Sequence, residues 1–311
     1  MTPNLFIVGA PKCGTSSLFD WLCQHPNIQG TRVKEPFFLI DPAHPLARRP
    51  SFAADGTDAW GSLFAREDAT APIRMEGTTH YLFDPVARDA ITAMSQARVI
   101  IVLREPATRV YSSFQYTANN LARLKPGLDF ARYLDLVREG RPLMPDWCTH
   151  PGSAYVLQND LHYSRYHEHV APWLSAVGPD RVRLLVMEDM IRDPQGAVAG
   201  IVAWLGLDPA RLPRIENAAR NRTERVRFPR VQNTVRSLNK RLRPPQAFRT
   251  VLKRGYGALQ FQDAAETSPE DRAALEHLRT QYEEDNARLA AVTGLDLTAW
   301  SITKPVPVQT P

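Results

Sequence analysis

Cysteine is scarce in this sequence, with three residues among 311. Cys13, Cys23 and Cys148 are odd in number, and their spacing matches neither a disulfide framework nor a set of zinc ligands. This scarcity excludes the small disulfide-stabilised folds and indicates a reducing compartment, which we expect to be the cytoplasm. It also gives no reason to expect a metal centre.

Long hydrophobic runs are absent as well. No segment approaches the roughly 20 apolar residues that a helix needs to cross a bilayer, and the N-terminus lacks the basic-then-apolar pattern of a signal peptide. We therefore expect a soluble protein with no transmembrane segment. Repeats and low-complexity blocks are missing too. With 43% hydrophobic residues the chain can bury a full core, and we predict a single domain over residues 1–303 followed by a flexible tail, 304–311.

Positive charge is in excess and unevenly distributed. The formal net charge of +5 and the pI of about 9.2 favour an anionic ligand, but they do not choose between a nucleotide, an acidic glycan, a lipid head group and a nucleic acid. Arginine and lysine dominate residues 220–254, where Glu224 is the one acid. Such a segment is either a solvated face of the protein or a binding region for an anion, and both interpretations stay open at this point.

The most informative motif is a short apolar run, Leu5–Val8, that enters a loop bracketed by Gly9 and Gly14 and then a helix. The first turn of a helix leaves N–H groups without intrahelical partners and carries the positive end of the helix dipole, so this junction predicts an anion site. The glycine spacing matches the phosphate loop G-x-x-x-x-G-K-[ST], but Thr15 stands at the lysine position and Lys12 lies within the loop. We predict a phosphate-binding variant of that loop. Its ligand atoms come from consecutive residues: Pro11, Lys12, Cys13, Gly14, Thr15, Ser16 and Ser17.

Strand and helix patterns alternate along the chain. Short apolar runs predict strands at residues 5–8, 98–103 and 182–187. Helical patterns follow them at residues 14–24, 106–119 and 194–205, with a last amphipathic helix at 269–292. Such alternation is typical of an α/β fold, here a P-loop-like, three-layer arrangement with a mostly parallel central sheet flanked by helices. Ligands bind such sheets at the carboxyl ends of the strands, where Lys12 and Arg104 lie.

Three segments together resemble a known family. The loop PKCGTSSL, the segment Lys34–Phe38 and the segment Val102–Pro106 with Ser112 are similar to those of the sulfotransferases that use 3′-phosphoadenosine 5′-phosphosulfate (PAPS). The resemblance is greatest to the bacterial and heparan-sulfate-type branch and extends from Phe6 to about Trp300. It implies a transferase of class EC 2.8.2 that moves a sulfuryl group from PAPS, by in-line transfer, to a hydroxyl of a carbohydrate, lipid or secondary metabolite. It implies no metal and no nucleic-acid partner, and it leaves the oligomeric state open.

The resemblance also implies roles in binding the donor. Lys12 is expected to neutralise the 5′-phosphate of the departing 3′-phosphoadenosine 5′-phosphate (PAP), and losing a charge-stabilising group of this kind costs about a hundredfold to a thousandfold in rate. The resemblance implies that Arg104 and Ser112 are the pair that holds the 3′-phosphate. A helix that begins just after Arg104 would also point Ser112 back toward the strand end, so both can meet one anion. Arg109, on the same helix, is expected in a surface salt bridge. The basic segment 220–254 is expected to cap the cofactor or to meet the acceptor.

Two residues compete for the role of the catalytic base. Glu35 corresponds to the glutamate that the resemblance implies as the base, and desolvation beside Phe37 and Phe38 is expected to raise the pKa of its carboxyl toward the working range. The alternative for Glu35 is a plain ion pair with Lys34 on a surface turn. His80 is the rival base, since an imidazole suits proton transfer near neutral pH.

The segment Met75–Leu82, which contains His80, departs from the family's E-K-T-P-x-Y pattern. Gly77 replaces the lysine and Thr79 replaces the proline, so a cation that the heparan-type enzymes place near the site is missing, which disfavours acidic-glycan acceptors. We expect Glu76 to orient other groups or to pack rather than to act as the base.

Two other classes of function remain open. A nucleotide-dependent kinase would share the phosphate loop, but the lysine of the P-loop kinases is missing from its position, and no aspartate ends a predicted strand as a magnesium ligand. A non-catalytic module would bind an acidic glycan or a nucleic acid through residues 220–254. Magnesium dependence would favour the kinase, and full function without Glu35 would favour the binding module.

Overall fold

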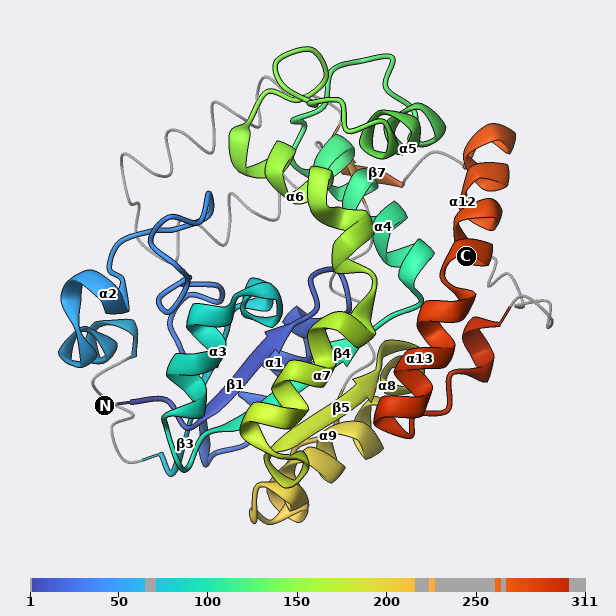
Figure 1. The fold of residues 1–311 in the computed structure, drawn as a ribbon. Coiled ribbons are helices and arrows are strands. Elements are labelled where there is room, and N and C mark those ends of the chain that lie inside the picture. Colours follow the sequence, from blue (N-terminus) through green and yellow to red (C-terminus); the bar gives the residue numbers. More distant parts are fainter. Residues whose placement is uncertain (1, 65–70, 216–223, 227–260, 264–266, 302–311) are drawn as a thin grey trace. The chain divides into compact units, whose positions relative to one another are not determined.

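The computed structural model describes residues 2–64, 71–215, 224–226, 261–263 and 267–301 (Figure 1). Most of the basic segment 220–254 and the whole of the expected tail, 304–311, lie outside the described residues. The expectations for these two segments therefore stay predictions.

The chain divides into two compact units. The first combines Met1–Val110, Asn159–Asn221 and His277–Pro311, and the second combines Tyr111–Gln158 and Arg222–Glu276. All predicted site residues except Ser112 belong to the first unit. The expectation of a single domain over residues 1–303 stays a prediction.

A five-stranded sheet forms the centre of the first unit. Its strands are β1 (Leu5–Gly9), β2 (Ile28–Gly30), β3 (Ile73–Gly77), β4 (Arg98–Leu103) and β5 (Val182–Val186). The order across the sheet is β2-β3-β1-β4-β5, and every neighbouring pair is parallel. The predicted parallel sheet is confirmed, and β1, β4 and β5 coincide with the apolar runs of the sequence. The short strands β2 and β3 carry no such run.

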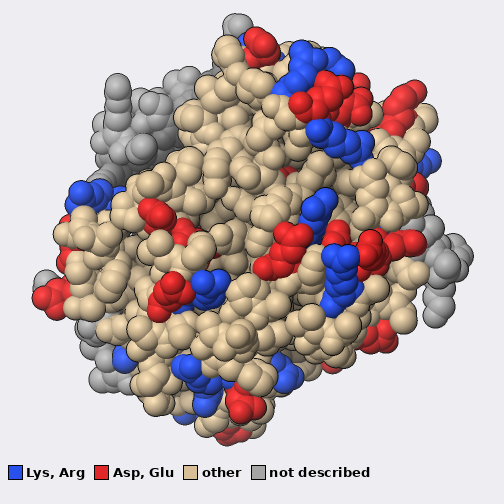
Figure 2. Space-filling model, viewed as in Figure 1, with Lys and Arg blue, Asp and Glu red and all other residues tan. Residues whose placement is uncertain are grey.

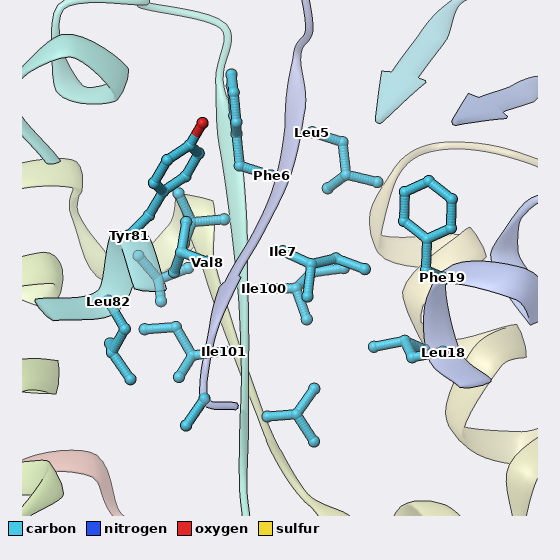
Figure 3. Packing of buried hydrophobic residues seen from close by; sticks show 14 of the residues in the cluster. Leu5, Phe6, Ile7, Val8, Leu18, Phe19, Tyr81, Leu82, Ile100 and Ile101 are labelled. Carbon is cyan, nitrogen blue, oxygen red and sulfur yellow. The ribbon is translucent and has the colours of Figure 1, made fainter. Parts of the chain in front are cut away.

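Both faces of the central strand β1 are buried, and its side chains alternate between them (Figure 3). Ile7 points to the side on which Phe19 lies, on helix α1 (Thr15–Leu22), whereas Val8 points to the opposite side, toward Leu82. A parallel strand that is covered on both faces requires an apolar residue at every position. This burial explains why the sequence of β1 is an uninterrupted apolar run before the loop.

Helices cover both faces of the sheet. α1, α8 (Met187–Arg192) and α9 (Pro194–Trp204) pack together on one face. The short helix η3 (Thr79–Phe83), α3 (Pro85–Thr92) and α7 (Tyr166–Val177) lie on the other face, and α13 (Glu283–Thr293) packs against α7. This order of layers is the expected three-layer α/β fold. The remaining short helices of the first unit are α2 (Phe52–Asp55), η1 (Thr57–Leu63), η5 (Pro179–Arg181), η6 (Pro209–Arg211) and η7 (Thr298–Trp300).

The last helix expected from the sequence, at residues 269–292, is divided in two. α12 (Pro269–Gln281) ends before Tyr282, whose backbone leaves the helical conformation with φ −97° and ψ 0°, and α13 follows. The Tyr282 hydroxyl donates to the carbonyl of Leu161 at 2.9 Å, a tertiary contact that the helical pattern alone does not contain. The amphipathic pattern predicts Leu275, Leu278, Tyr282 and Leu289 on the buried side; the last three are buried, whereas Leu275 is only half-buried.

The second unit is mainly helical. It contains α5 (Phe130–Arg138), the π-helix η4 (Tyr116–Asn120) and parts of α4 (Pro106–Gln115) and α6 (Pro151–Tyr163). The Phe114 ring packs between the rings of Phe130 and Tyr133, with centroids 5.5 and 5.2 Å away. A two-stranded antiparallel ladder joins β6 (Glu224–Val226) to β7 (Phe261–Asp263).

Charges of both signs are interspersed on the face of the molecule drawn in Figure 2. Of the helices that the structure describes, none combines the length and the apolar character needed to cross a membrane.

Candidate active site

The carboxyl ends of the five parallel strands lie along one edge of the sheet, and the predicted site residues follow them. Lys12 comes after β1, Glu35 after β2, His80 after β3 and Arg104 directly after β4. The chain passes from β3 on one side of β1 to β4 on the other, so the strand order reverses at β1. Open α/β sheets bind their ligands at such a switch point. The fold therefore places these four residues at the edge where a ligand is expected.

The loop between β1 and α1 has the geometry of an anion site. Gly14 caps α1 in the left-handed conformation, with φ 75°, and no described side chain caps this end of the helix. Thr15, Ser16 and Ser17 form the first turn, where N–H groups lack intrahelical partners. A Cβ on Gly14 would lie 2.9 Å from Cε of Met190, the movable end of a flexible side chain, so the left-handed conformation rather than the space favours glycine here. These features fit a bound phosphate group.

Lys12 sits in this loop with a left-handed backbone, φ 68°. Burial lowers the pKa of its ammonium from 10.5 to about 8, with a further lowering from the nearby Arg104 and an opposing contribution from Glu35. Arg104 lies so close that its Nη1 donates to the carbonyl oxygen of Lys12 at 3.4 Å. Two cations therefore converge on one loop, an arrangement that an anion stabilises.

Tyr166 supports the loop from α7. Its hydroxyl donates to the carbonyl of Arg104 at 3.0 Å and lies 3.7 Å from Sγ of Cys13. Cys13 is fully buried, and burial raises the pKa of its thiol to about 11. The thiol therefore stays protonated at neutral pH, and Cys13 can offer a ligand only its backbone.

Arg109 is not on the surface, contrary to the prediction. Its side chain is completely buried, and Nη1 forms an ion pair with Oδ1 of Asp160 at 3.0 Å. Nε donates to the hydroxyl of Ser164 at 2.8 Å. The helical pattern of α4 does not reveal this partner, because Asp160 follows 51 residues later in the chain.

Ser112, the expected partner of Arg104, lies on α4 in the second unit. Its side chain is half-buried. The shared role of Ser112 and Arg104 at a 3′-phosphate stays a prediction.

Hydrogen bonds hold both the backbone and the side chain of Glu35. Its own backbone is left-handed, with φ 62°, and its N–H donates to the carbonyl of Gly77 at 2.8 Å. Its Oε1 accepts from the hydroxyl of Thr79 at 2.7 Å and from Nζ of Lys34 at 3.3 Å. The ion pair with Lys34 that the sequence left as an alternative is therefore present, but it lies at the strand ends beside the phosphate loop rather than on an isolated surface turn.

The expected direction of the pKa shift at Glu35 is wrong. Burial does raise the pKa of this carboxyl, but the ammonium of Lys34, the hydroxyl of Thr79 and the nearby His80 outweigh it and leave the pKa below its ordinary value. Glu35 is consequently ionised at neutral pH. The sequence could not indicate this, because Thr79 reaches Glu35 only through the pairing of strands.

The carboxyl with a raised pKa is Glu76, which is completely buried in β3. Burial raises its pKa from 4.5 to about 7. The hydroxyl of Thr78 donates to Glu76 at 2.6 Å and accepts the N–H of Phe37 at 3.3 Å. Glu76 thus holds the segment that carries Glu35, in agreement with the orienting role expected for it.

His80 is buried among aromatic rings. The ring centroids of Phe37, Phe83 and Tyr163 lie 6.0 to 6.1 Å from that of the imidazole. Burial lowers the pKa of His80 from 6.5 to about 4, so the ring is neutral at neutral pH. Within the described part of the chain, Nδ1 of His80 has no hydrogen-bond partner. The imidazole is therefore a second possible base, but an enclosed one.

Sequence reasoning missed two groups at this site. The sequence suggests Lys34 only as a possible surface partner of Glu35, and it gives Tyr166 no role at the site. The sequence does place Lys34 directly before Glu35, and this adjacency is the signal that could have indicated a cation beside the base.

A parallel α/β sheet with an anion-binding loop at its switch point defines a P-loop-like class of protein. Comparison with known sequences gives the family: the profile described as the sulfotransferase domain matches residues 2–246. This match covers well over half of the chain. The chain therefore belongs to the sulfotransferase domain family.

Individual relatives agree with this assignment. The chain is 26% identical over 206 residues to heparan sulfate glucosamine 3-O-sulfotransferase 6 of Homo sapiens, covering 66% of this chain and 52% of that protein. It is 24% identical over 207 residues to bifunctional heparan sulfate N-deacetylase/N-sulfotransferase 1 of Caenorhabditis briggsae, covering 66% of this chain and 23% of the relative. The match thus spans between about a quarter and about half of the length of these relatives.

A solved structure shows the same fold. A sulfotransferase from Alicyclobacillus acidocaldarius superposes with a TM-score of 0.64 at 24% sequence identity, covering 96% of this chain and 99% of that one. The fold expected from the sequence is thereby supported over nearly the whole chain.

Proposed function

We propose that this chain transfers the sulfuryl group of PAPS to a hydroxyl of a carbohydrate, lipid or secondary metabolite. The observation that carries the proposal is the convergence of Lys12, Arg104 and Glu35. Two cations and one ionised carboxylate meet where the sulfotransferase domain has its phosphate loop, and the charges of Arg104 and Glu35 both act on the pKa of Lys12. Sulfuryl transfer needs these charges, because a phosphate departs on one side and a proton leaves on the other.

The donor half of the site is proposed to lie at the loop between β1 and α1. PAPS supplies an activated bond between sulfur and the 5′-phosphate. The ammonium of Lys12 neutralises the charge that collects on that phosphate as the bond breaks, and the first turn of α1, from Thr15 to Ser17, binds its oxygens. Arg104 binds the 3′-phosphate, and Ser112 is its predicted partner. No metal ion is needed, because protein cations supply the charge.

The acceptor half is proposed to centre on Glu35. Its carboxylate is ionised at neutral pH and accepts the proton of the attacking hydroxyl. Lys34 and Thr79 hold the carboxylate in one orientation. Glu35 is favoured over His80 as the base, because the His80 ring is enclosed by three aromatic side chains whereas the side chain of Glu35 is 36% exposed.

A carbohydrate hydroxyl is the first acceptor class to test. The relatives named above are heparan sulfate sulfotransferases, and a sugar hydroxyl requires the same base chemistry as an alcohol of a lipid or a secondary metabolite. Gly77 carries no side chain and so supplies no cation at this position, which disfavours an acidic acceptor. Neutral and acidic sugars should therefore be compared directly.

The test is transfer of labelled sulfate from PAPS to a panel of sugar, lipid and phenolic hydroxyls in the presence of a chelator. We expect turnover with at least one acceptor class by the wild type, and loss of turnover with retained PAP binding in Glu35→Gln. His80→Gln serves as the matched comparison, and it should keep most of the turnover. Full activity in Glu35→Gln combined with inactivity in His80→Gln would transfer the role of base to His80. Phosphate transfer from ATP with magnesium would replace the proposal with a kinase.

A further inference from the structure

Lys34 lies beside Gly77, the last residue of β3. A Cβ on Gly77 would lie 3.1 Å from Cδ2 of Phe19 and 3.7 Å from Cε of Lys34, an ordinary van der Waals contact. Lys34 belongs to the segment that follows β2, the strand next to β3 in the sheet. Its side chain therefore neighbours the position from which a residue 77 side chain would project.

The ammonium of Lys34 joins the two halves of the proposed site. Its Nζ donates to Oγ1 of Thr15 at 3.4 Å and to Oε1 of Glu35 at 3.3 Å. Thr15 begins α1 on the side of the phosphate loop, and Glu35 is the proposed base. In the proposed reaction the sulfuryl group moves from the side of Thr15 to the side of Glu35, and Lys34 contacts both residues.

The position of Lys34 is fixed and largely shielded from solvent. Its side chain is 18% exposed. The segment that carries it is tied to β3 at both ends, because the N–H of Thr31 donates to Met75 and the N–H of Glu35 donates to Gly77. A cation held in this way needs little reorganisation when charge develops beside it.

The charge of Lys34 acts on three groups near the proposed base. Burial is the largest influence on the pKa of Glu35, Glu76 and His80, and Lys34 lowers the pKa of all three. On the donor side, Lys12 and Arg104 are cations at the phosphate loop. Lys34 contacts Thr15 on the side of that loop and Glu35 on the side of the base.

We propose that Lys34, beside Gly77, is a second catalytic cation, which contacts the oxygens of the sulfuryl group during its transfer. This inference rests on the proposed function. In the step, the acceptor oxygen bonds to sulfur, the bond between sulfur and the 5′-phosphate breaks with its electron pair going to the phosphate, and the hydroxyl proton goes to Glu35. Lys34 forms no covalent bond; it stabilises the negative oxygens on sulfur, while Lys12 stabilises the leaving phosphate.

The first test is the turnover of Lys34→Met. Because removing one charge-stabilising group from a transition state costs about a hundredfold to a thousandfold, we expect kcat to fall by at least about a hundredfold while PAP affinity changes by less than about threefold. Arg32→Met is the matched control, since Arg32 is exposed on the same segment and loses the same charge. Wild-type kcat in Lys34→Met would overturn the proposal, and so would an equal loss in Arg32→Met.

The second test moves the charge rather than removing it. Gly77→Lys in a Lys34→Ala background projects an ammonium from the space that Lys34 vacates, with an adjustment of a few tenths of an ångström by Phe19. Its kcat should exceed that of Lys34→Ala alone by at least about tenfold, whereas Gly77→Ala in the same background should leave kcat at the value of Lys34→Ala. No recovery in a relocated variant that folds and binds PAP would contradict the assignment.

The pH profile of kcat distinguishes a catalytic role of Lys34 from a purely structural one. This test does not need the variant that combines Gly77→Lys with Lys34→Ala. Removing Lys34 removes a cation that lowers the pKa of Glu35, so the acidic limb of kcat should move to higher pH in Lys34→Met and stay in place in Lys34→Arg. An unmoved limb in Lys34→Met would count against the proposal. If the wild type itself transfers no sulfuryl group, the proposed function fails; if it does and Lys34→Met matches it, only the role of Lys34 fails.

Discussion

Lys12 and Glu35 share one left-handed backbone conformation, with φ of 68° and 62°, on two different loops at the same edge of the sheet. Non-glycine residues rarely adopt this conformation, and holding one there costs on the order of 1–3 kcal/mol. Phe37, two residues after Glu35, adopts it as well, with φ 58°. Backbone strain of this kind persists only where the surroundings enforce it, and it concentrates at functional sites. Its coincidence with the proposed cation and base supports their roles.

Two substitutions at Glu35 separate backbone strain from side-chain loss. Glu35→Gly and Glu35→Ala both remove the carboxylate and its ion pair with Lys34, but only glycine adopts a positive φ freely. We expect Glu35→Gly to be more stable than Glu35→Ala by about 1 kcal/mol in denaturant unfolding, and both to be inactive. Equal stabilities would mean that the backbone at Glu35 carries no strain.

The affinity for PAP should depend on pH through Lys12. Its ammonium has a pKa of about 8 in the free protein, so the cation that binds phosphate is lost as the pH rises through that value. We expect PAP to bind more weakly at about pH 9 than at about pH 7, and Lys12→Met to bind weakly at both. The phosphates of PAP are already ionised over this range, so they do not cause the change. Calorimetric titration measures it, and a pH-independent affinity in the wild type would contradict the assigned pKa.

Glu76 should make the stability of the protein depend on pH. The folded protein keeps this carboxyl protonated up to about pH 7, whereas the unfolded chain ionises near its ordinary value of 4.5. The folded state therefore binds more protons between these values, and the free energy of unfolding falls as the pH rises from about 4.5 to about 7, by an amount on the order of 3 kcal/mol. Glu76→Gln should flatten this slope. Urea unfolding at about pH 5 and about pH 8 tests it, and equal slopes in both proteins would exclude Glu76 as the source.

Much of the central sheet could be predicted from the sequence. A parallel strand that is buried on both faces reads as a continuous apolar run, and β1, β4 and β5 have such runs. β3 escaped prediction because Arg74 and Glu76 interrupt its apolar pattern. The burial of Glu76 depends on hydrogen bonds from Thr78, and local sequence patterns do not show such compensation.

The candidate site was predictable in its members but not in its electrostatics. Local motifs place Lys12 and Arg104 at the ends of predicted strands, whereas Glu35 is identified by its motif alone, because the strand before it, β2, carries no apolar run. The pKa of Glu35 depends instead on Lys34 and Thr79, and Thr79 becomes its neighbour only when the sheet forms. Contacts that form only in the tertiary structure therefore decide the direction of such pKa shifts.

The folded state should depend strongly on both members of the buried ion pair between Arg109 and Asp160. Removing one partner leaves an uncompensated charge in the core, so we expect Arg109→Met to lower the free energy of unfolding by about 3–5 kcal/mol. Arg109→Met combined with Asp160→Leu should recover part of that loss. Arg192→Met is the control, because Arg192 pairs with Asp189 at the surface, where such pairs contribute about 0–1 kcal/mol. If Arg109→Met lowered the free energy of unfolding no more than Arg192→Met does, the pair of Arg109 and Asp160 would behave as a solvent-exposed ion pair.

The donor site is the claim on which the other assignments depend, and calorimetric titration with PAP, adenosine 5′-monophosphate and ATP with magnesium tests it most directly. The proteins are the wild type, Arg104→Ala and the control Arg183→Ala, which alters an exposed arginine on β5. We predict that PAP binds the wild type at least about tenfold more tightly than the monophosphate, because a charged hydrogen bond contributes about 1.5–3 kcal/mol. Arg104→Ala should remove most of this difference, and Arg183→Ala should leave it intact. A preference for ATP with magnesium, or no binding of any of the three, would contradict the proposed function.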